Sequence, residues 1–392
     1  MVRPKLVYIV TVPTTARVLL RGQLAFMREA GFDVTVVSSP GPELEEVGER
    51  EGVRTVGVQM AREIDVVRDA RAFSELRATI ARLAPDIVNA STPKAGLLGM
   101  MSASLCRVPV RIYLLRGLRF EGTRGAKRWI LEGTERVAAG CANRVVCVSE
   151  SVRAGYLERG LTSLAKCTVL GSGSSNGVDL DRFDPERAKP MAEALRAKFG
   201  ISSDAMVFGF VGRPVADKGI RELIFAWEKA RKVNPSARLL IVGAGFAGDT
   251  VDQALAQWMR GRDDIIAAGE VSEPAPYYAL MSVLLFPSYR EGFPNAPLEA
   301  AAMGVPTIGF SATGTRDVIV DGQTGLLVPV GDGKGLAASL ERYVRDAAER
   351  VAHGKEAQTR ARALFDRRRI WGLWLAEYTE LLAKRGLRLP RN

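Results

Sequence analysis

The chain has 392 residues, 47% of them hydrophobic and 25% charged, and this composition excludes a disordered or fibrous protein. The net charge of +11 favours an anionic small molecule, a polyanion or an anionic membrane surface as a partner, although a basic surface also serves solubility alone. Four cysteines without a CxxC pair and a single histidine, His353, argue against a zinc site.

The start of the chain lacks the apolar segment and cleavage site of a signal peptide. No uninterrupted apolar run approaches the roughly 18 residues of a spanning helix. We therefore expect a cytoplasmic protein with reduced thiols. The length suggests two domains of about 150–200 residues each.

Short apolar runs alternate with longer amphipathic ones through the first half of the chain. The runs predicted to be strands cover residues 5–11, 34–38, 87–90, 110–115, 144–149 and 168–170. The predicted helices cover residues 18–30, 70–83, 95–105 and 124–139. Continuous apolar strands between helices are typical of βαβ units, which build a parallel sheet covered on both faces.

The pattern breaks at a Gly/Ser-rich run, 171–176, which is followed by a polar run, 178–185, that ends in proline. This is the best candidate for a domain junction. Asp179 and Asp181 form a DxD pair here. A metal site and a solvated turn are the two interpretations of this pair, and a position in a linker favours the turn.

The same alternation restarts in the second half. Predicted strands cover 207–212, 238–242, 265–268, 283–287, 307–309 and 325–328, and predicted helices cover 218–233, 250–259, 335–364 and 370–382. We therefore predict an α/β protein of two doubly wound, Rossmann-like domains, 1–176 and 177–365, facing across a cleft. The remaining residues, 366–392, are expected to form a helix that packs back toward the first domain. Ligands of such folds lie beyond the carboxyl ends of the strands.

The segment with the most chemistry is 286–306. After a predicted strand, a polar loop carries Glu291, Asn295 is a candidate cap, and an Ala-rich helix follows with Glu299 in its first turn. The open N–H groups at a helix start attract a diphosphate, and carboxylates accept hydrogen bonds from sugar and ribose hydroxyls. Either acid alone is more simply a solvated loop acid or a helix-dipole partner. The pair in this context favours a nucleotide-sugar site.

This segment resembles the E-x7-E signature of the GT-B glycosyltransferases of family 4, with Glu291 and Glu299 as its two acids. The resemblance extends to 211–219, similar to the family's VGR…KG element, and to 322–329, similar to its closing DGxxGxLV strand. Residues 177–183 resemble the NGVD…F stretch near the linker. These motifs cover the second domain in the family's order and spacing.

The resemblance implies a retaining transferase in which the second domain binds the nucleotide sugar and the first binds the acceptor, with no cofactor or metal. Carried over by position, Arg213 and Lys218 bind the donor diphosphate, Glu291 contacts the donor sugar, and Glu299 binds the ribose. A surface pair on a turn is the plainer interpretation of the two cations. Further donor contacts are implied for Gly212, Glu270, Val271, Gly292, Phe293, Pro294 and Asn295. A weaker candidate for lining the cleft is Gly243-Ala244-Gly245.

Two segments of the first domain, 89–99 and 115–119, resemble those of capsular and exopolysaccharide members of the family. By this resemblance, the residues expected to contact the acceptor or line the cleft are Thr92, Lys94, Arg116 and Gly117. The family's usual histidine in this domain is absent. Arg17 replaces a Gly-Gly loop, and both phosphate binding and a surface role remain open for it. An acceptor on polyprenyl diphosphate, at the inner face of the cytoplasmic membrane, is what the resemblance implies.

Residues 107–128 carry seven cations against one acid, Glu121, and precede Trp129 and Ile130. A basic stretch beside apolar residues fits peripheral binding to an anionic membrane or to a pyrophosphate-linked lipid. An ordinary helix, with Trp129 in the core and arginines on the solvent face, fits the pattern equally well.

The favoured function is transfer of a hexose or N-acetylhexosamine from a UDP-sugar to a lipid-diphosphate-linked saccharide in surface glycan assembly. The alternatives are a soluble acceptor, a UDP-sugar 2-epimerase on the same fold, and a non-catalytic nucleotide-binding subunit. The missing histidine weakens the epimerase, because epimerisation needs acid and base groups at the sugar. A dehydrogenase is disfavoured because no GxGxxG follows the first strand.

Overall fold

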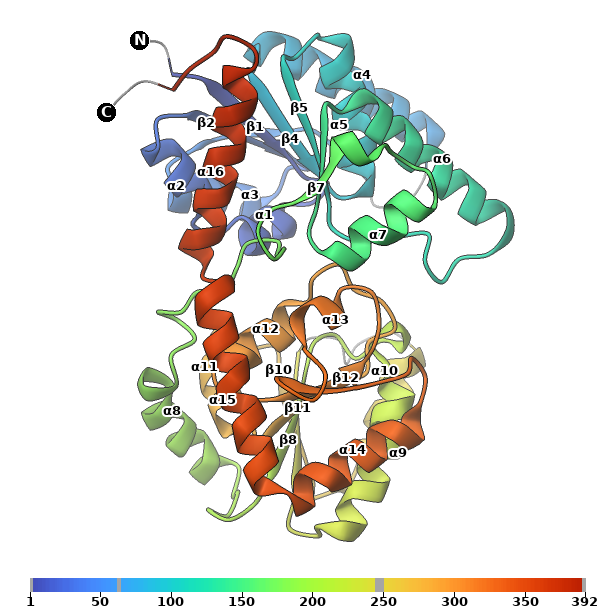
Figure 1. The fold of residues 1–392 in the computed structure, drawn as a ribbon, viewed down its shortest axis with the longest axis vertical. Coiled ribbons are helices and arrows are strands. Elements are labelled where there is room, and N and C mark those ends of the chain that lie inside the picture. Colours follow the sequence, from blue (N-terminus) through green and yellow to red (C-terminus); the bar gives the residue numbers. More distant parts are fainter. Residues whose placement is uncertain (1–2, 62–64, 244–249, 390–392) are drawn as a thin grey trace. The chain divides into compact units, whose positions relative to one another are not determined.

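The computed structural model describes residues 3–61, 65–243 and 250–389. The chain divides into two compact units. Unit 1 consists of Met1–Gly177 together with Arg367–Asn392, and unit 2 consists of Val178–Asp366. Figure 1 shows that each unit is a sheet with helices packed against it. Unit 1 is therefore assembled from two separate stretches of chain, whereas unit 2 is continuous.

Within the described residues, unit 1 contains a seven-stranded parallel sheet with the order β3-β2-β1-β4-β5-β6-β7. Its strands are β1 (Lys5–Ile9), β2 (Asp33–Ser38), β3 (Arg54–Gly57), β4 (Ile87–Ser91), β5 (Val110–Leu115), β6 (Arg144–Cys147) and β7 (Cys167–Val169). Its helices are α1 (Pro13–Leu19), α2 (Gln23–Glu29), α3 (Pro42–Glu51), α4 (Val66–Leu83), α5 (Pro93–Leu105), α6 (Gly125–Cys141), α7 (Glu150–Glu158) and α16 (Arg367–Ala383). The central strands are almost wholly buried, as the continuous apolar runs predicted.

Helix α16 completes the core of unit 1 from the far end of the sequence. Its Tyr378 hydroxyl accepts a hydrogen bond from Asn89 Nδ2 at 2.6 Å and donates one to the Tyr8 hydroxyl at 3.1 Å. Asn89 and Tyr8 are paired residues of β4 and β1, so they lie on one face of the sheet. Figure 1 shows α16 running along unit 1 beside α2. Removing α16 would expose this face to water.

The helix predicted over 18–30 is in fact two helices, α1 and α2. Gly22 separates them with a φ of 79°, a conformation that favours glycine. The Trp371 ring of α16 lies so close that a Cβ on Gly22 would be 2.6 Å from it. The break is thus imposed by tertiary packing, which the helical period of the sequence does not record.

Unit 2 contains, within the described residues, a six-stranded parallel sheet with the order β10-β9-β8-β11-β12-β13. Its strands are β8 (Val207–Val211), β9 (Arg238–Val242), β10 (Ile265–Gly269), β11 (Val283–Phe286), β12 (Thr307–Phe310) and β13 (Gly325–Val328). Its helices are α8 (Pro185–Lys198), α9 (Ile220–Val233), α10 (Thr250–Met259), α11 (Ala275–Leu280), α12 (Asn295–Ala302), α13 (Thr315–Val318), α14 (Gly333–Arg345) and α15 (Ala347–Leu364). One core, which includes Phe208, Trp227 and Tyr343, fills the space between sheet and helices.

The single helix predicted over 335–364 is also two helices, α14 and α15. Asp346 stands between them, and its side chain accepts a hydrogen bond from the Glu349 amide at 2.8 Å, which caps the second helix. Elements that the sequence patterns did not predict are α3, β3, α7, α8, α11 and α13. No helix in the described ranges is both long and apolar enough to span a membrane.

Candidate functional site

Two loops meet at the carboxyl edge of the unit 2 sheet, one after β8 and one after β11. The first loop ends at Gly219, whose φ is 70°, and a Cβ there would lie 2.0 Å from the Pro287 carbonyl oxygen. Glycine is therefore required for the two loops to approach. The Tyr289 amide donates to the Asp217 carbonyl at 3.0 Å and joins the loops further along. The order of β8 and β11 as neighbours in the sheet makes this meeting possible.

Lys218 and Glu291, predicted from separate motifs, form an ion pair where these loops meet. The Ser288 hydroxyl also donates to Glu291 Oε1 at 2.7 Å. The two charged side chains are only 22% and 15% exposed, so their attraction is less screened than that of a surface pair. An ammonium group has three donors, and Lys218 can therefore bind a ligand oxygen without leaving Glu291.

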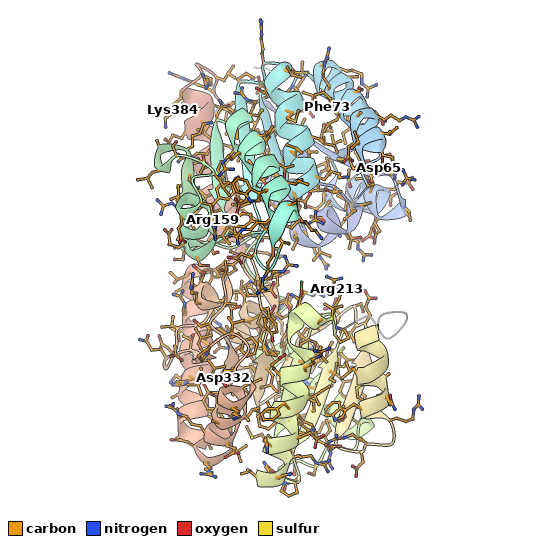
Figure 2. The ribbon with its side chains drawn as sticks, turned by 90° about the vertical axis from the view of Figure 1, so that its right-hand side faces the viewer. Asp65, Phe73, Arg159, Arg213, Asp332 and Lys384 are labelled. Carbon is orange, nitrogen blue, oxygen red and sulfur yellow. The ribbon has the colours of Figure 1, made fainter. Side chains whose placement is uncertain are left out.

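Arg213 lies at the same edge and is exposed. Figure 2 shows it at the end of unit 2 where α9 begins. In the part of the chain that the structure describes, its guanidinium has no hydrogen-bond or ion-pair partner. The preceding Gly212 anchors the turn, because its amide donates to the Val242 carbonyl at 2.9 Å. This edge thus presents two cations in ion pairs, Lys218 with Glu291 and Arg290 with Asp217. The guanidinium of Arg213, which has no partner among the described residues, suits bidentate binding of phosphate.

The loop that carries Glu291 continues through Gly292 and Phe293 into α12. Phe293 is buried, with its ring 5.2 Å from that of Phe365. The prediction that Asn295 caps this helix is wrong: Pro294 occupies the cap position, Asn295 is the first helical residue, and no side chain caps the helix start. Glu299 therefore lies in the second turn rather than the first.

Glu299 receives a hydrogen bond from the hydroxyl of Tyr278, at 2.9 Å from its Oε2. Desolvation raises the pKa of Glu299 to about 7, while the Tyr278 hydroxyl and the charge of Arg182 act in the opposite direction. Tyr278 was missed by the sequence reasoning. It comes from α11, a short helix without a usable apolar period, so only the fold brings it to Glu299.

Glu270 and Val271, the predicted base contacts, follow edge strand β10 and lie two strands away from β8. Glu270 is exposed and Val271 is half-buried. The turn after β9 connects the two regions, since the Gly243 amide donates to the Gly269 carbonyl at 2.8 Å. A Cβ on Gly243 would lie 2.1 Å from the Gly212 carbonyl oxygen, so the turns after β8 and β9 touch through backbone. Ala244 and Gly245 lie outside the described residues.

The predicted residues of unit 1 are held in separate local contacts. Thr92, at the start of α5, has a φ of 73°, and its hydroxyl lies 2.6 Å from that of Thr11. Lys94 forms a largely buried ion pair with Asp69 of α4. Arg17 of α1 lies within 3.5 Å of Glu43 and 3.7 Å of Glu46 of α3. The lysine and both arginine contacts are thus ion pairs between neighbouring helices.

Arg116, directly after β5, is the exception. All three guanidinium nitrogens are buried, and none has a hydrogen-bond partner among the described residues. Its electrostatic neighbours are the Tyr378 and Tyr8 hydroxyls, and burial lowers its pKa to about 10. The next residue, Gly117, has a φ of 150° and is half-buried. A buried cation without a counter-charge is costly, so this group is a candidate to receive an anion.

Helix α6 carries an exposed apolar strip. Trp129 is 74% exposed, Ile130 55% and Val137 44%. The interpretation that places Trp129 in the core is therefore wrong. Lys127 and Arg124 are exposed beside the start of this strip. We call Trp129, Ile130, Val137, Lys127 and Arg124 the α6 surface.

Other candidate groups have structural partners. The Asp179 carboxylate accepts the backbone amides of Asp181 and Arg182 at 3.2 and 3.3 Å, which is the geometry of a turn. Buried His353 lies 2.7 Å from the Tyr343 hydroxyl. No group of three or more His, Cys, Asp or Glu side chains in the described ranges is arranged to hold a metal ion.

The model of the family "Glycosyl transferases group 1" matches residues 205–346, and that of "Glycosyl transferase 4-like domain" matches residues 14–173. The chain is 34% identical, over 94% of both chains, to the capsular polysaccharide biosynthesis glycosyltransferase CapM of Staphylococcus aureus. It is 26% identical, over 73% of both chains, to the UDP-Gal:alpha-D-GlcNAc-diphosphoundecaprenol alpha-1,3-galactosyltransferase of Escherichia coli.

Among solved structures, Anabaena HepE in complex with UDP and glucose matches with a TM-score of 0.79 at 19% identity, covering 96% of this chain and 99% of that one. At this identity the match establishes the fold alone. It confirms the predicted fold class of two Rossmann-like domains.

Proposed function

Because the chain belongs to the GT-B glycosyltransferases of family 4, we propose that it moves a hexose or N-acetylhexosamine from a UDP-sugar to a polyprenyl-diphosphate-linked saccharide. The transfer retains the configuration of the anomeric carbon and serves surface polysaccharide assembly. The observation that carries this proposal is the carboxyl edge of unit 2, where the Lys218–Glu291 pair and the uncommitted Arg213 lie on two adjoining loops.

The chemistry follows from these charges. In the transfer, the bond between the anomeric carbon and the diphosphate oxygen breaks, and the oxygen keeps the electron pair. Arg213 and Lys218 stabilise the negative charge that develops there. The acceptor oxygen bonds to the same face of the anomeric carbon, and its proton passes to the departing diphosphate. Glu291 holds Lys218 in place and accepts hydrogen bonds from the donor sugar.

The donor nucleotide is supported by two relatives. The E. coli galactosyltransferase is named for UDP-Gal, and HepE was crystallised with UDP. In unit 2 the ribose would bind to Glu299, and the base would bind near Glu270 and Val271, with backbone contacts from Gly212 and from Gly292, Phe293, Pro294 and Asn295. No metal is required in this proposal, because two cationic side chains already supply positive charge at the diphosphate.

The lipid-linked acceptor is supported by the names of two relatives and by Arg116. CapM is named for capsular polysaccharide biosynthesis, and the E. coli enzyme is named for an acceptor on diphosphoundecaprenol. The buried guanidinium of Arg116 has no hydrogen-bonded counter-charge among the residues that the structure describes, and a phosphate of the acceptor would supply one. We assign Thr92, Lys94, Gly117 and Arg17 to the surroundings of the acceptor.

The α6 surface supports attachment to the inner face of the cytoplasmic membrane. Exposed tryptophan and isoleucine bury readily at the boundary between headgroups and acyl chains, and adjacent cations attract anionic lipids. A protein with this surface would meet a membrane-embedded acceptor without a spanning helix.

The test is turnover with defined substrates. Purified protein is incubated with UDP-, GDP- or ADP-sugars and a diphosphate-linked saccharide on a polyprenyl chain in anionic vesicles. We expect transfer from a UDP-hexose or UDP-N-acetylhexosamine, retention by NMR, and a change of less than about twofold with EDTA. Failure of every nucleotide sugar to bind or react would refute the proposal.

Two further arms test its parts. Equal turnover of a soluble saccharide and the lipid-linked one would refute the lipid acceptor. Incubation of UDP-N-acetylglucosamine without acceptor tests the epimerase alternative, and accumulation of its 2-epimer would replace the transferase.

A further inference from the structure

The contact between Tyr278 and Glu299 assigns a role to a residue that no motif names. We propose that Tyr278 is a positioning residue, whose hydroxyl holds one carboxylate oxygen of Glu299 so that the rest of the carboxylate faces the vicinal diol of the donor ribose. This inference rests on the proposed function, in which Glu299 is the ribose contact. Tyr278 acts through Glu299 and does not itself touch the donor.

The bonding of Glu299 leaves acceptor capacity for a ligand. Tyr278 donates to Oε2 at 2.9 Å, and the described residues provide no partner for Oε1. An ionised carboxylate has about four acceptor positions, so one phenol hydroxyl leaves room for two more donors. The adjacent 2′- and 3′-hydroxyls of a ribose are such a pair. Glu299 is partly exposed, which gives a ligand access to it.

Tyr278 is fixed firmly enough to orient a flexible glutamate. It is fully buried. The ring of Phe183 packs edge-on against it, with centroids 6.0 Å apart and an interplanar angle of 68°. The neighbouring Arg182 donates to Glu273 Oε2 at 3.1 Å and to the Ser272 carbonyl, so it ties the same segment to the loop before α11. A glutamate side chain has three rotatable bonds, and one anchored oxygen removes most of that freedom.

The same loop starts at the candidate base contacts, Glu270 and Val271, and ends in α11. One short stretch of chain would therefore serve two parts of the donor, the base directly and the ribose through Tyr278. This explains why a phenol from an otherwise unremarkable helix is buried beside a carboxylate. Phenylalanine would fill the same volume but would leave the Glu299 carboxyl without the hydrogen-bond donor that the described residues provide.

The charge state of Glu299 gives the proposal a measurable signature. Its pKa is raised to about 7 by burial, against the opposing effects of the hydrogen bond from Tyr278 of α11 and the charge of Arg182 from the segment before α8. Helix α15 packs against α12 from another side, but its Gln358 and Arg360 side chains bond to backbone carbonyls, those of Ala302 and Asp317. Loss of the Tyr278 hydroxyl therefore raises the pKa of Glu299 further.

UDP should bind more weakly as the pH falls. Only the ionised carboxylate accepts two hydroxyl donors, so UDP affinity falls by up to about tenfold per pH unit below the pKa of Glu299. In the Tyr278→Phe variant, UDP affinity should begin to fall at a pH about one unit higher than in wild type. This difference corresponds to the free energy that one hydrogen bond typically contributes. The variant should bind UDP about fivefold more weakly at pH 7 and within about twofold of wild type at pH 9.

Calorimetric titration of the full-length protein with UDP from pH 5.5 to 9 tests this inference. The variants are Tyr278→Phe, Glu299→Gln, the double variant, and Tyr277→Phe as a matched control on the same helix. The phosphate of UDP titrates identically in every case, so ratios of Kd isolate the protein groups. We expect Glu299→Gln to abolish the protein's pH dependence, the double variant to equal Glu299→Gln, and Tyr277→Phe to match wild type.

An equal loss of affinity at every pH in Tyr278→Phe, or a change in thermal midpoint alone, would overturn the positioning role and leave the proposed function standing. Absence of UDP binding by wild type would instead count against the proposed function. Wild-type binding that is unaffected by Glu299→Gln would remove Glu299 from the ribose site and the inference with it.

Discussion

The carboxyl edges of the two sheets treat their charged residues in opposite ways. In unit 2, residues from separate motifs converge: Lys218 and Glu291 form an ion pair across two loops. Arg213 lies at the same edge, and its guanidinium has no partner among the described residues. In unit 1, Lys94 and Arg17 form ion pairs with acids of neighbouring helices. The guanidinium of Arg116 is buried and has no hydrogen-bond partner in the described part of the chain. One edge is a preassembled cluster, and the other is a set of separate contacts around one uncompensated charge.

This difference fits the substrate that each edge would bind in the proposed function. A nucleotide diphosphate has a fixed charge and shape, and a cluster held together by its own ion pair meets it without rearrangement. In the proposed function, a lipid-linked saccharide would bring a charged diphosphate to unit 1. The guanidinium of Arg116, which has no hydrogen-bond partner among the described residues, would then pair with that charge.

The largest effect is expected at the preassembled cluster. Lys218→Met removes a cation at the site where charge develops, and we expect kcat to fall about 10²–10³-fold. Lys229→Met, on the exposed side of α9, is the control and should change kcat less than twofold. Steady-state kinetics at saturating donor measures both variants. A loss of less than fivefold in Lys218→Met would place the diphosphate elsewhere.

An intermediate effect is expected at Arg116. Arg116→Met removes a buried charge that has no hydrogen-bond partner within the described ranges. The free protein should therefore become more stable, while the KM for the proposed lipid-linked acceptor rises about tenfold or more. Thermal unfolding and acceptor kinetics give the two readings. A lower thermal midpoint would show that the guanidinium stabilises the free fold, and an unchanged KM would remove the acceptor role.

The smallest effect is expected at the α6 surface. Replacing Trp129 and Ile130 by serine should weaken sedimentation with anionic vesicles severalfold, with turnover of a detergent-solubilised acceptor nearly unchanged. Val351→Ser, at an exposed apolar residue of unit 2, is the matched control. Binding of wild type should also decline as salt increases. Vesicle binding that survives the double substitution would place the membrane contact on another face.

The sequence predicted the sheets well because both are buried on two sides, which produces apolar runs such as those of β5 and β9. It placed Lys218 and Glu291 in one site, and a glycine contact at Gly219 explains how they meet. It could not predict the role of Tyr278, because a single tyrosine is not part of a periodic pattern. It also could not predict the break at Gly22, because that break is caused by packing against Trp371 of α16, which is distant in sequence.

The position of Trp129 is a further feature that the sequence alone could not predict. An aromatic residue on a helix after a basic stretch has the same local pattern whether it faces a core or the solvent, and only the packing of α5 against α6 decides which side of α6 is covered. The same limit applies to Arg116. The sequence shows that this residue is charged, but not that its guanidinium is buried without a hydrogen-bond partner among the described residues.

The return of α16 to unit 1 has a consequence for how the molecule is made. Unit 2 is continuous from Val178 to Asp366, so a ribosome releases it whole before Arg367–Asn392 has emerged. Unit 1 begins before unit 2 but lacks the partner of Tyr8 and Asn89 until α16 has been synthesised. N-terminal domains usually complete their folding first during synthesis, but here unit 2 can complete its fold before unit 1 does. Helix α16 closes the first domain, and a nascent chain that stops before α16 would expose one face of an otherwise complete sheet.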